Sequence, residues 1–167
     1  MKRNRNISFF STFFWFLFFY YVVGDYMRIF YAFKIKKEFY DIYMDTPSVL
    51  YSFLNQLYNF RREDLDYGNN LFRQIANMFD KEELDKRLFL KLHNKMKYCK
   101  RGDEHIINNL YKNEVSIMKI KKSYVVINSN KDCTEFFDFL VEEDDCIFVC
   151  DFINHDYFYA NKVKMLV

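Results

Sequence analysis

The chain has 167 residues, of which 51% are hydrophobic, 22% aromatic and 29% charged, with a formal net charge of +2. The apolar content excludes a disordered chain, the charged content excludes a polytopic membrane protein, and the near-neutral charge gives no case for a general nucleic-acid surface. One compact domain with a real core fits this length. Because only three glycines and one proline are present, we expect long regular elements with few tight turns.

An uncharged apolar run, ISFFSTFFWFLFFYYVV, occupies residues 7–23. A helix through residue 24 would be roughly 27 Å long, close to the roughly 30 Å hydrocarbon thickness of a bilayer. Its phenylalanines cover the full circumference, which favours a membrane anchor over a buried helix of a soluble core. We therefore expect a basic flank over residues 1–6 and a transmembrane anchor over residues 7–24. The residues expected in lipid include Ile7, Phe14, Trp15, Phe19 and Val23.

Two properties of this run stay open. Basic residues stand on both sides of it, so the charge rule that sets orientation in a membrane gives a nearly balanced signal. A cleaved signal peptide is the alternative to an anchor, because Val22 and Gly24 lie at the small-residue positions before a possible cut at Asp25. The apolar core is longer and bulkier than in most signal peptides, which favours the anchor.

Residues 25–45 are expected to continue from the anchor as an amphipathic stalk helix. Tyr31, Ile35, Phe39 and Ile42 recur at helical spacing with charged residues between them. The lysines of this segment suit a contact with lipid headgroups, and the alternative is a solvated helix face.

The segment from residue 46 to residue 100 is expected to be helical. Thr46 and Pro47 mark a helix start, with Thr46 as the N-cap and Pro47 at the first helical position. Asp80 and Glu83 form a capping box that opens a further helix.

The pattern changes after Gly102, the expected C′ residue of the last helix. The remaining segments are rich in β-branched residues or carry capping residues. They predict a hairpin over residues 114–120 and 123–128, a short helix opened by Asp132 and Glu135, and strands over residues 146–153 and 157–166. The expected fold class is therefore α+β, with the anchor, a helical half over residues 46–100 and a small antiparallel sheet with one helix over residues 101–167.

All four cysteines, Cys99, Cys133, Cys146 and Cys150, lie beyond the anchor. An even number in this part of the chain fits two disulfides that brace a small β-containing unit, and the alternative is four free thiols in a reducing compartment. If Cys146 and Cys150 share a strand they are about 13 Å apart, beyond the roughly 4.4 to 6.8 Å Cα separation of a disulfide, so each would need another partner. A helix or tight turn there would bring the two within reach.

No set of residues points to catalysis. Cys146, Cys150 and His155 are close in sequence, but their spacing is not that of a zinc-binding knuckle. His105 has acidic neighbours and no nucleophile at a meaningful spacing for a hydrolytic triad. Three glycines cannot build a glycine-rich phosphate loop. We expect no enzymatic activity, no cofactor, no metal and no small-molecule substrate.

Four features resemble a known family in their order along the chain: the run at residues 7–23, the segment GDYMRIFYAFKIKKEFYD after it, Cys99 before the hairpin, and CTEFFDFL opening the short helix at Cys133. This layout resembles the small N-terminally anchored components of the poxvirus entry and fusion complex. The resemblance implies two intramolecular disulfides and a non-enzymatic subunit, displayed on a virion membrane, that joins other anchored proteins to drive membrane fusion.

The alternative function is that of an accessory subunit of a mitochondrial inner-membrane complex, which the phenylalanine excess of an AT-rich genome favours. In both cases we expect a single-pass membrane protein whose partners are the lipid bilayer and other membrane-anchored proteins, with no nucleic acid bound.

Overall fold

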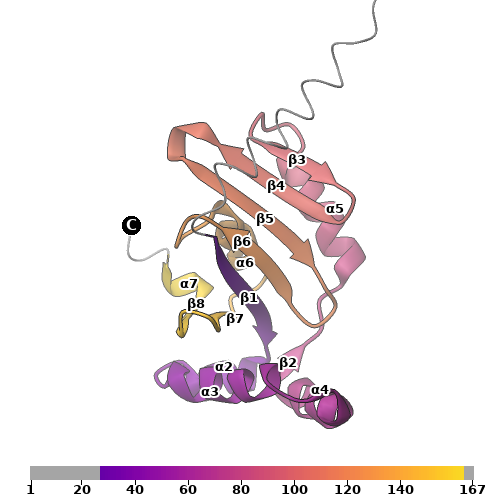
Figure 1. Ribbon diagram of the computed structural model, residues 1–167, viewed down its shortest axis with the longest axis vertical. Helices are drawn as coiled ribbons and strands as arrows, with labels where there is room; N and C mark the ends of the chain where they lie inside the picture. Colours follow the sequence, from indigo (N-terminus) through magenta and orange to yellow (C-terminus); the bar gives the residue numbers. More distant parts are fainter. Residues whose placement is uncertain (1–26, 164–167) are drawn as a thin grey trace, which may run out of the picture.

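The centre of the fold is an antiparallel sheet in which the long strands follow the order β3-β4-β5-β6-β1-β7-β8, with β2 paired to the end of β1 (Figure 1). The computed structural model describes residues 27–163. The strands are β1 (Arg28–Ile35), β2 (Ala76–Asn77), β3 (Tyr98–Arg101), β4 (Glu104–Asn109), β5 (Glu114–Ile120), β6 (Val125–Ser129), β7 (Ile147–Asp151) and β8 (Asp156–Tyr159). The helices are α2 (Lys37–Tyr43), α3 (Pro47–Tyr58), α4 (Leu65–Ile75), α5 (Lys81–Leu92), α6 (Glu135–Glu143) and α7 (Ala160–Val163), with short 3-10 turns η1 (Arg62–Asp64) and η2 (Leu110–Lys112).

Strand β1 lies inside the sheet, between β6 and β7. Phe30 and Ala32 point into one hydrophobic core, and Phe33 and Ile35 point into another on the opposite face. A strand buried on both faces carries a nearly continuous apolar run with no clear alternation. The stalk helix expected over residues 25–45 is therefore wrong, because apolar residues on every side of the chain also fit helical spacing.

The helices form two unequal layers. Helices α5 and α6 lie behind the sheet in Figure 1, and their apolar residues, such as Leu88 and Phe136, join the core beneath β1 and β4 to β6. Helices α2, α3 and α4 gather at the lower end, where Leu50, Leu54 and Phe72 pack with residues of β1, β7 and β8. None of the helices within residues 27–163 lies on the near face of β3 to β6 in this view.

Several local predictions are confirmed. Helix α3 begins at Pro47, and α5 follows Asp80, whose side chain accepts a hydrogen bond from the Glu83 N–H at 3.1 Å. The expected hairpin is β5 paired with β6. Helix α6, however, has Thr134 as its N-cap, two residues after the predicted Asp132.

The predicted fold class is wrong. In the described part of the chain the sheet has eight strands and forms the centre, whereas we expected a helical half and a small sheet. Within residues 27–163, no helix is both long enough and apolar enough to cross a bilayer. The expected anchor, with Ile7, Phe14, Trp15, Phe19 and Val23, lies outside the described residues.

Candidate functional site

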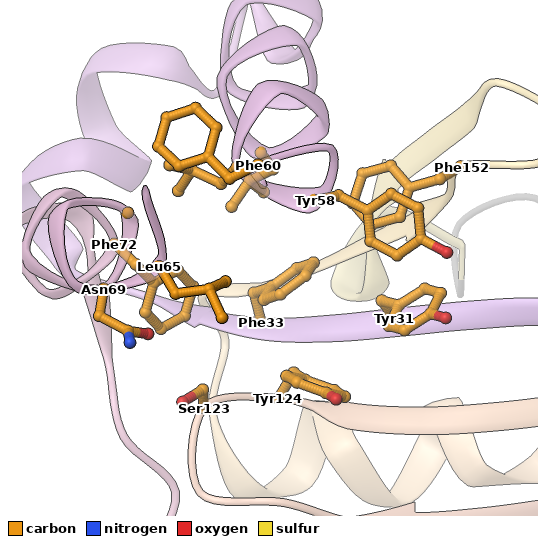
Figure 2. A pocket seen from close by; sticks show the side chains of 13 residues that line it. Tyr31, Phe33, Tyr58, Phe60, Leu65, Asn69, Phe72, Ser123, Tyr124 and Phe152 are labelled. Atoms are coloured by element: carbon orange, nitrogen blue, oxygen red, sulfur yellow. The ribbon is translucent and has the colours of Figure 1, made fainter. Parts of the chain in front are cut away.

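A pocket lined mainly by aromatic side chains lies between the lower helices and the sheet (Figure 2). Its volume is about 270 Å³. Five separate parts of the chain supply its walls: β1, the region from α3 to η1, α4, the turn before β6, and the turn after β7. The aromatic side chains used below are Tyr31, Phe33, Tyr58, Phe72, Tyr124 and Phe152.

These rings hold one another in place. Tyr58 stacks on Phe152 with ring centroids 4.4 Å apart, and Tyr31 meets Tyr58 edge to face at 5.4 Å. Phe33 contacts Phe72 edge to face at 5.8 Å. Such pairs contribute about 0.5–1.5 kcal/mol each beyond the burial of their area, so the pocket wall is preformed.

The pocket offers hydrogen-bonding groups but no strong base or nucleophile. Burial, together with the neighbouring Tyr58, raises the pKa of Tyr31, so its phenol stays neutral at physiological pH. Asn69 and Ser123 add polar atoms to the lining (Figure 2). An apolar side chain with one polar group would fit these surroundings.

Gly68 allows α4 to approach the end of α3. A Cβ atom at residue 68 would lie 2.7 Å from Cδ2 of Phe60, closer than carbon atoms tolerate. The rim of the pocket is more open, since half of Tyr58 and half of Leu65 are exposed to solvent. The site is thus a preformed apolar pocket with an apolar rim.

A second polar cluster joins α5 to β3 and β4. The Tyr98 hydroxyl donates to Nδ1 of His105 at 2.7 Å, and Nε2 of His105 donates to Asp85 at 2.9 Å, while Lys100 also pairs with Asp85. Burial lowers the pKa of His105 despite the nearby carboxylate. The order hydroxyl, imidazole, carboxylate resembles a proton relay. Because Tyr98 and His105 are both buried, the cluster instead holds α5 against β3 and β4.

The sequence placed His105 among its acidic neighbours, whereas the structure pairs it with Asp85 of α5. His155 lies in the turn before β8 at a positive φ of 55° and contacts the Tyr51 hydroxyl at 3.1 Å. Among the described residues, no group of three or more histidine, cysteine and acidic side chains is placed to hold a metal ion.

The four cysteines all carry free thiols in this structure. Cys99 of β3 and Cys133 before α6 are exposed, and Cys146 and Cys150 are buried. Cys150 belongs to β7 and Cys146 comes directly before it, which is the extended arrangement in which these two cannot bond to each other. Disulfide formation stays a prediction.

Sequence reasoning missed the pocket. Its seven aromatic residues lie between positions 31 and 152, and no periodicity in the sequence reports that such distant segments meet. The aromatic content of 22% was the one signal, because aromatic residues are enriched where proteins bind one another.

A family model described as "Sporulation inhibitor of replication protein SirA" matches residues 28–164. The match begins at the first residue of β1 and extends past the last described helix. No curated protein matches the chain.

This match corrects the resemblance stated above. The matched family is bacterial, so the predicted kinship with poxvirus entry and fusion components is wrong. Also wrong are the predicted viral envelope or mitochondrial membrane location, the fusion function, and the lipid bilayer and anchored proteins as partners. Because the matched range covers most of the 167 residues, the chain belongs to the bacterial family of the sporulation inhibitor of replication protein SirA.

Proposed function

We propose that this chain restrains DNA replication in a cell that enters sporulation, and that it does so by binding a protein of the replication machinery without catalysing a reaction. The family description supports the first part of the proposal. The surface of the molecule and its aromatic pocket support the second.

The charge distribution favours a protein target over DNA. The net charge is only +2, and lysines in and beside the sheet are paired with acids, as in Lys119 with Glu104 at 2.8 Å and Lys97 with Glu135. A protein that binds duplex DNA needs several lysines or arginines free to neutralise phosphates. Blocking DNA directly is therefore the weaker alternative.

The single observation that carries the proposal is the preformed aromatic pocket with an apolar rim. At about 270 Å³, it lies just below the roughly 300–1,000 Å³ typical of small-molecule sites, and it suits one or two inserted side chains. Binding energy at protein interfaces concentrates where an aromatic or aliphatic anchor fills such a hollow. We infer that the partner presents an apolar side chain to this pocket.

The test uses a matched pair of leucines. Leu65 lies in the pocket lining at the start of α4 and is 49% exposed, whereas Leu90 lies on α5, in the layer behind the sheet, and is 57% exposed. Leu65→Asp places a charge at the rim, and an acid in a first helical turn is compatible with the helix dipole. Leu90→Asp makes the same change away from the pocket.

The wild-type chain and each variant would be expressed in a growing spore-forming bacterium while DNA content per cell mass is measured. We expect the wild type and Leu90→Asp to lower the DNA content, and Leu65→Asp to have lost most of this effect. All three proteins should reach the same level in the cell and unfold at the same urea concentration. A wild-type chain without effect on DNA content would refute the function. Equal inhibition by both variants would refute the pocket as its site.

A further inference from the structure

Two apolar side chains lie in solvent on the turn that joins β4 to β5. Leu110 and Tyr111, in the short 3-10 turn η2, are 83% and 104% exposed. Single exposed apolar residues are common on protein surfaces, but here two large ones are adjacent in the chain. Tyrosine is also among the side chains that contribute most to binding at protein interfaces. We call Leu110 and Tyr111 the apolar tip.

Asparagine side chains hold the turn that carries the apolar tip. The side-chain oxygen of Asn109 accepts a hydrogen bond from the Lys112 N–H at 3.4 Å. The side-chain amide of Asn130 donates to the Asn113 carbonyl at 3.0 Å, and Asn113 adopts the left-handed conformation at a φ of 47°. Because the turn is fixed before any contact forms, little conformational entropy is lost when the tip is bound.

The apolar tip and the aromatic pocket lie at opposite ends of β5. This strand begins at Glu114, directly after the turn, and ends at Ile120, three residues before Ser123 of the pocket lining. Its 7 residues span about 23 Å at roughly 3.3 Å each. In Figure 1 the β4–β5 turn lies at the upper left, and α3 and α4 lie at the lower end. A chain therefore cannot place its tip in its own pocket, whereas a second copy can.

The apolar tip fits the chemistry of the pocket. The pocket has aromatic walls and the polar atoms of Asn69 and Ser123, and Tyr111 is an aromatic side chain with one polar group. None of the 13 described residues that line the pocket is charged. An uncharged tip can therefore be buried there without taking a charge out of water.

The charges beside the tip and beside the pocket have opposite signs. Near the tip, Lys97 and Lys112 share the carboxylate of Glu135, and the Lys112 side chain stays 65% exposed. At the pocket rim, the segment 61–66 carries three acids and two basic residues, and all of its residues are exposed. Opposite charges of this kind steer two surfaces toward each other and fix how they meet.

We propose that a second copy of this chain inserts its apolar tip into the aromatic pocket of the first. Tip and pocket are different surfaces, so the contact is head-to-tail, and assemblies grow beyond a dimer unless they close into a ring. A contact this small is weak and transient. A bound copy also covers the pocket, so the replication protein has to displace it. This last consequence rests on the proposed function, whereas the association itself does not.

The experiment measures self-association of the full-length chain by sedimentation velocity at increasing protein concentration. Three variants carry the same kind of substitution: Tyr111→Asp at the tip, Leu65→Asp at the pocket rim, and Leu90→Asp on α5 as the control. We expect the wild type and Leu90→Asp to form assemblies that grow with concentration. Tyr111→Asp and Leu65→Asp should each weaken the association by at least about tenfold. Urea denaturation verifies that every variant is folded.

Mixing the two defective variants separates a head-to-tail contact from a symmetric one. The Leu65→Asp chain keeps its tip, and the Tyr111→Asp chain keeps its pocket. We expect the mixture to form a dimer with one chain of each kind and no larger species, although neither variant associates by itself. A fluorescent label on one of the two variants detects this mixed dimer by its faster sedimentation.

Three results of these measurements would overturn the proposal. The first is a wild-type chain that stays monomeric at every concentration. The second is a mixture of Leu65→Asp and Tyr111→Asp that does not associate. The third is association that all three variants retain, because it would come from another part of the chain.

The assay of DNA content in growing cells keeps this proposal separate from the proposed function. Tyr111→Asp should inhibit replication at least as strongly as the wild type, because no second copy competes for its pocket. Weaker inhibition by Tyr111→Asp would assign the tip to the replication protein and overturn the proposal. A wild-type chain without effect on DNA content would refute the function alone, and the sedimentation results would still decide the association.

Discussion

Arg28, the first residue of β1, contacts three carboxylates at once. Its guanidinium lies 2.7 Å from Asp132, 2.8 Å from Asp151 and 2.7 Å from Asp156. Asp151 is buried, and Arg28 together with Asn154 keeps the pKa of its carboxyl below the usual value although burial acts in the opposite direction. Arg28 thereby ties the start of the central strand to the turn between β7 and β8.

Arg28→Met should lower the free energy of unfolding by about 3 kcal/mol, because the buried Asp151 carboxylate would lose its cation. Urea denaturation at pH 7 measures the change. Asp132→Asn is the control: the Asp132 side chain is 83% exposed, and removing an exposed partner costs under about 1 kcal/mol. Similar losses in the two variants would show that the buried carboxylate does not depend on Arg28.

His105 predicts a pH dependence with a definite sign. In the folded chain its pKa is lowered by burial, while in the unfolded chain it stays near 6.5. Between these two values the unfolded state binds the proton and the folded state does not, so the free energy of unfolding falls as the pH falls below about 6.5, by at most about 1.4 kcal/mol per pH unit.

His105→Gln removes this titration while keeping a polar side chain between Tyr98 and Asp85. The loss of stability between pH 7 and pH 5 should therefore be smaller in the variant than in the wild type, as followed by urea denaturation at each pH. Since Asp85 and Lys100 are present in both chains, the difference between the two slopes isolates His105. Parallel slopes would assign the pH dependence to other groups.

At the scale of elements, a buried carboxylate fixes the start of α6. One oxygen of Glu114, on β5, accepts hydrogen bonds from the Thr134 hydroxyl at 2.8 Å, the Ser116 hydroxyl at 2.9 Å and the Glu135 N–H at 3.1 Å. Ser129 of β6 extends the network through Ser116 at 2.8 Å. A negative charge at a helix N-terminus is favourable, so β5 both pairs in the sheet and caps the helix behind it.

Thr134→Val should cost about 1–2 kcal/mol of unfolding free energy, because the helix loses its N-cap oxygen and Glu114 loses one donor. Ser116→Ala removes a second donor from the same oxygen. The double variant should lose an amount that differs from the sum of the two single losses by more than about 0.5 kcal/mol, as expected for groups in one network. Strict additivity would mean that the two hydroxyls act independently.

Elements with a local signal could be predicted, and those decided by tertiary contacts could not. Three of the predicted features depend only on residues nearby in the sequence: the helix start at Pro47, the capping box of Asp80 and Glu83, and the β-branched hairpin. Strand β1 is decided by β6 and β7, which lie more than 90 residues further along the chain. Gly102 was expected to end a helix, but at a φ of 59° it makes the turn between β3 and β4, since both places favour a left-handed residue.

At the scale of the whole molecule, the pocket arises from unequal coverage of one sheet. Helices α5 and α6 cover one face, and α2 to α4 cover the other face at one end only (Figure 1). The pocket lies where that cover stops, which is why β1, α3, α4 and the turn before β6 all contribute to it. A sequence without a known topology does not reveal such a boundary.

The cysteines report on opening of the whole molecule. In the reduced chain, two thiols, Cys99 and Cys133, should react with a disulfide reagent without unfolding, because both are exposed. Burial raises the pKa of Cys133, which lowers its thiolate fraction at pH 8. Cys146 and Cys150 are buried in the sheet and against the lower helices, so they should react only when this part of the chain opens.

Stopped-flow absorbance with a chromogenic reagent would resolve two thiols in a fast phase and two in a slow phase whose rate rises with urea as global unfolding does. Ile75→Ala, in the core around Cys146 and Cys150, should accelerate the slow phase by about tenfold or more, because a cavity there costs about 2–5 kcal/mol. The fast phase should not change. No reactive thiol before reduction would instead show that Cys99 and Cys133 are oxidised, and four fast thiols would show that the lower helices do not shield the sheet.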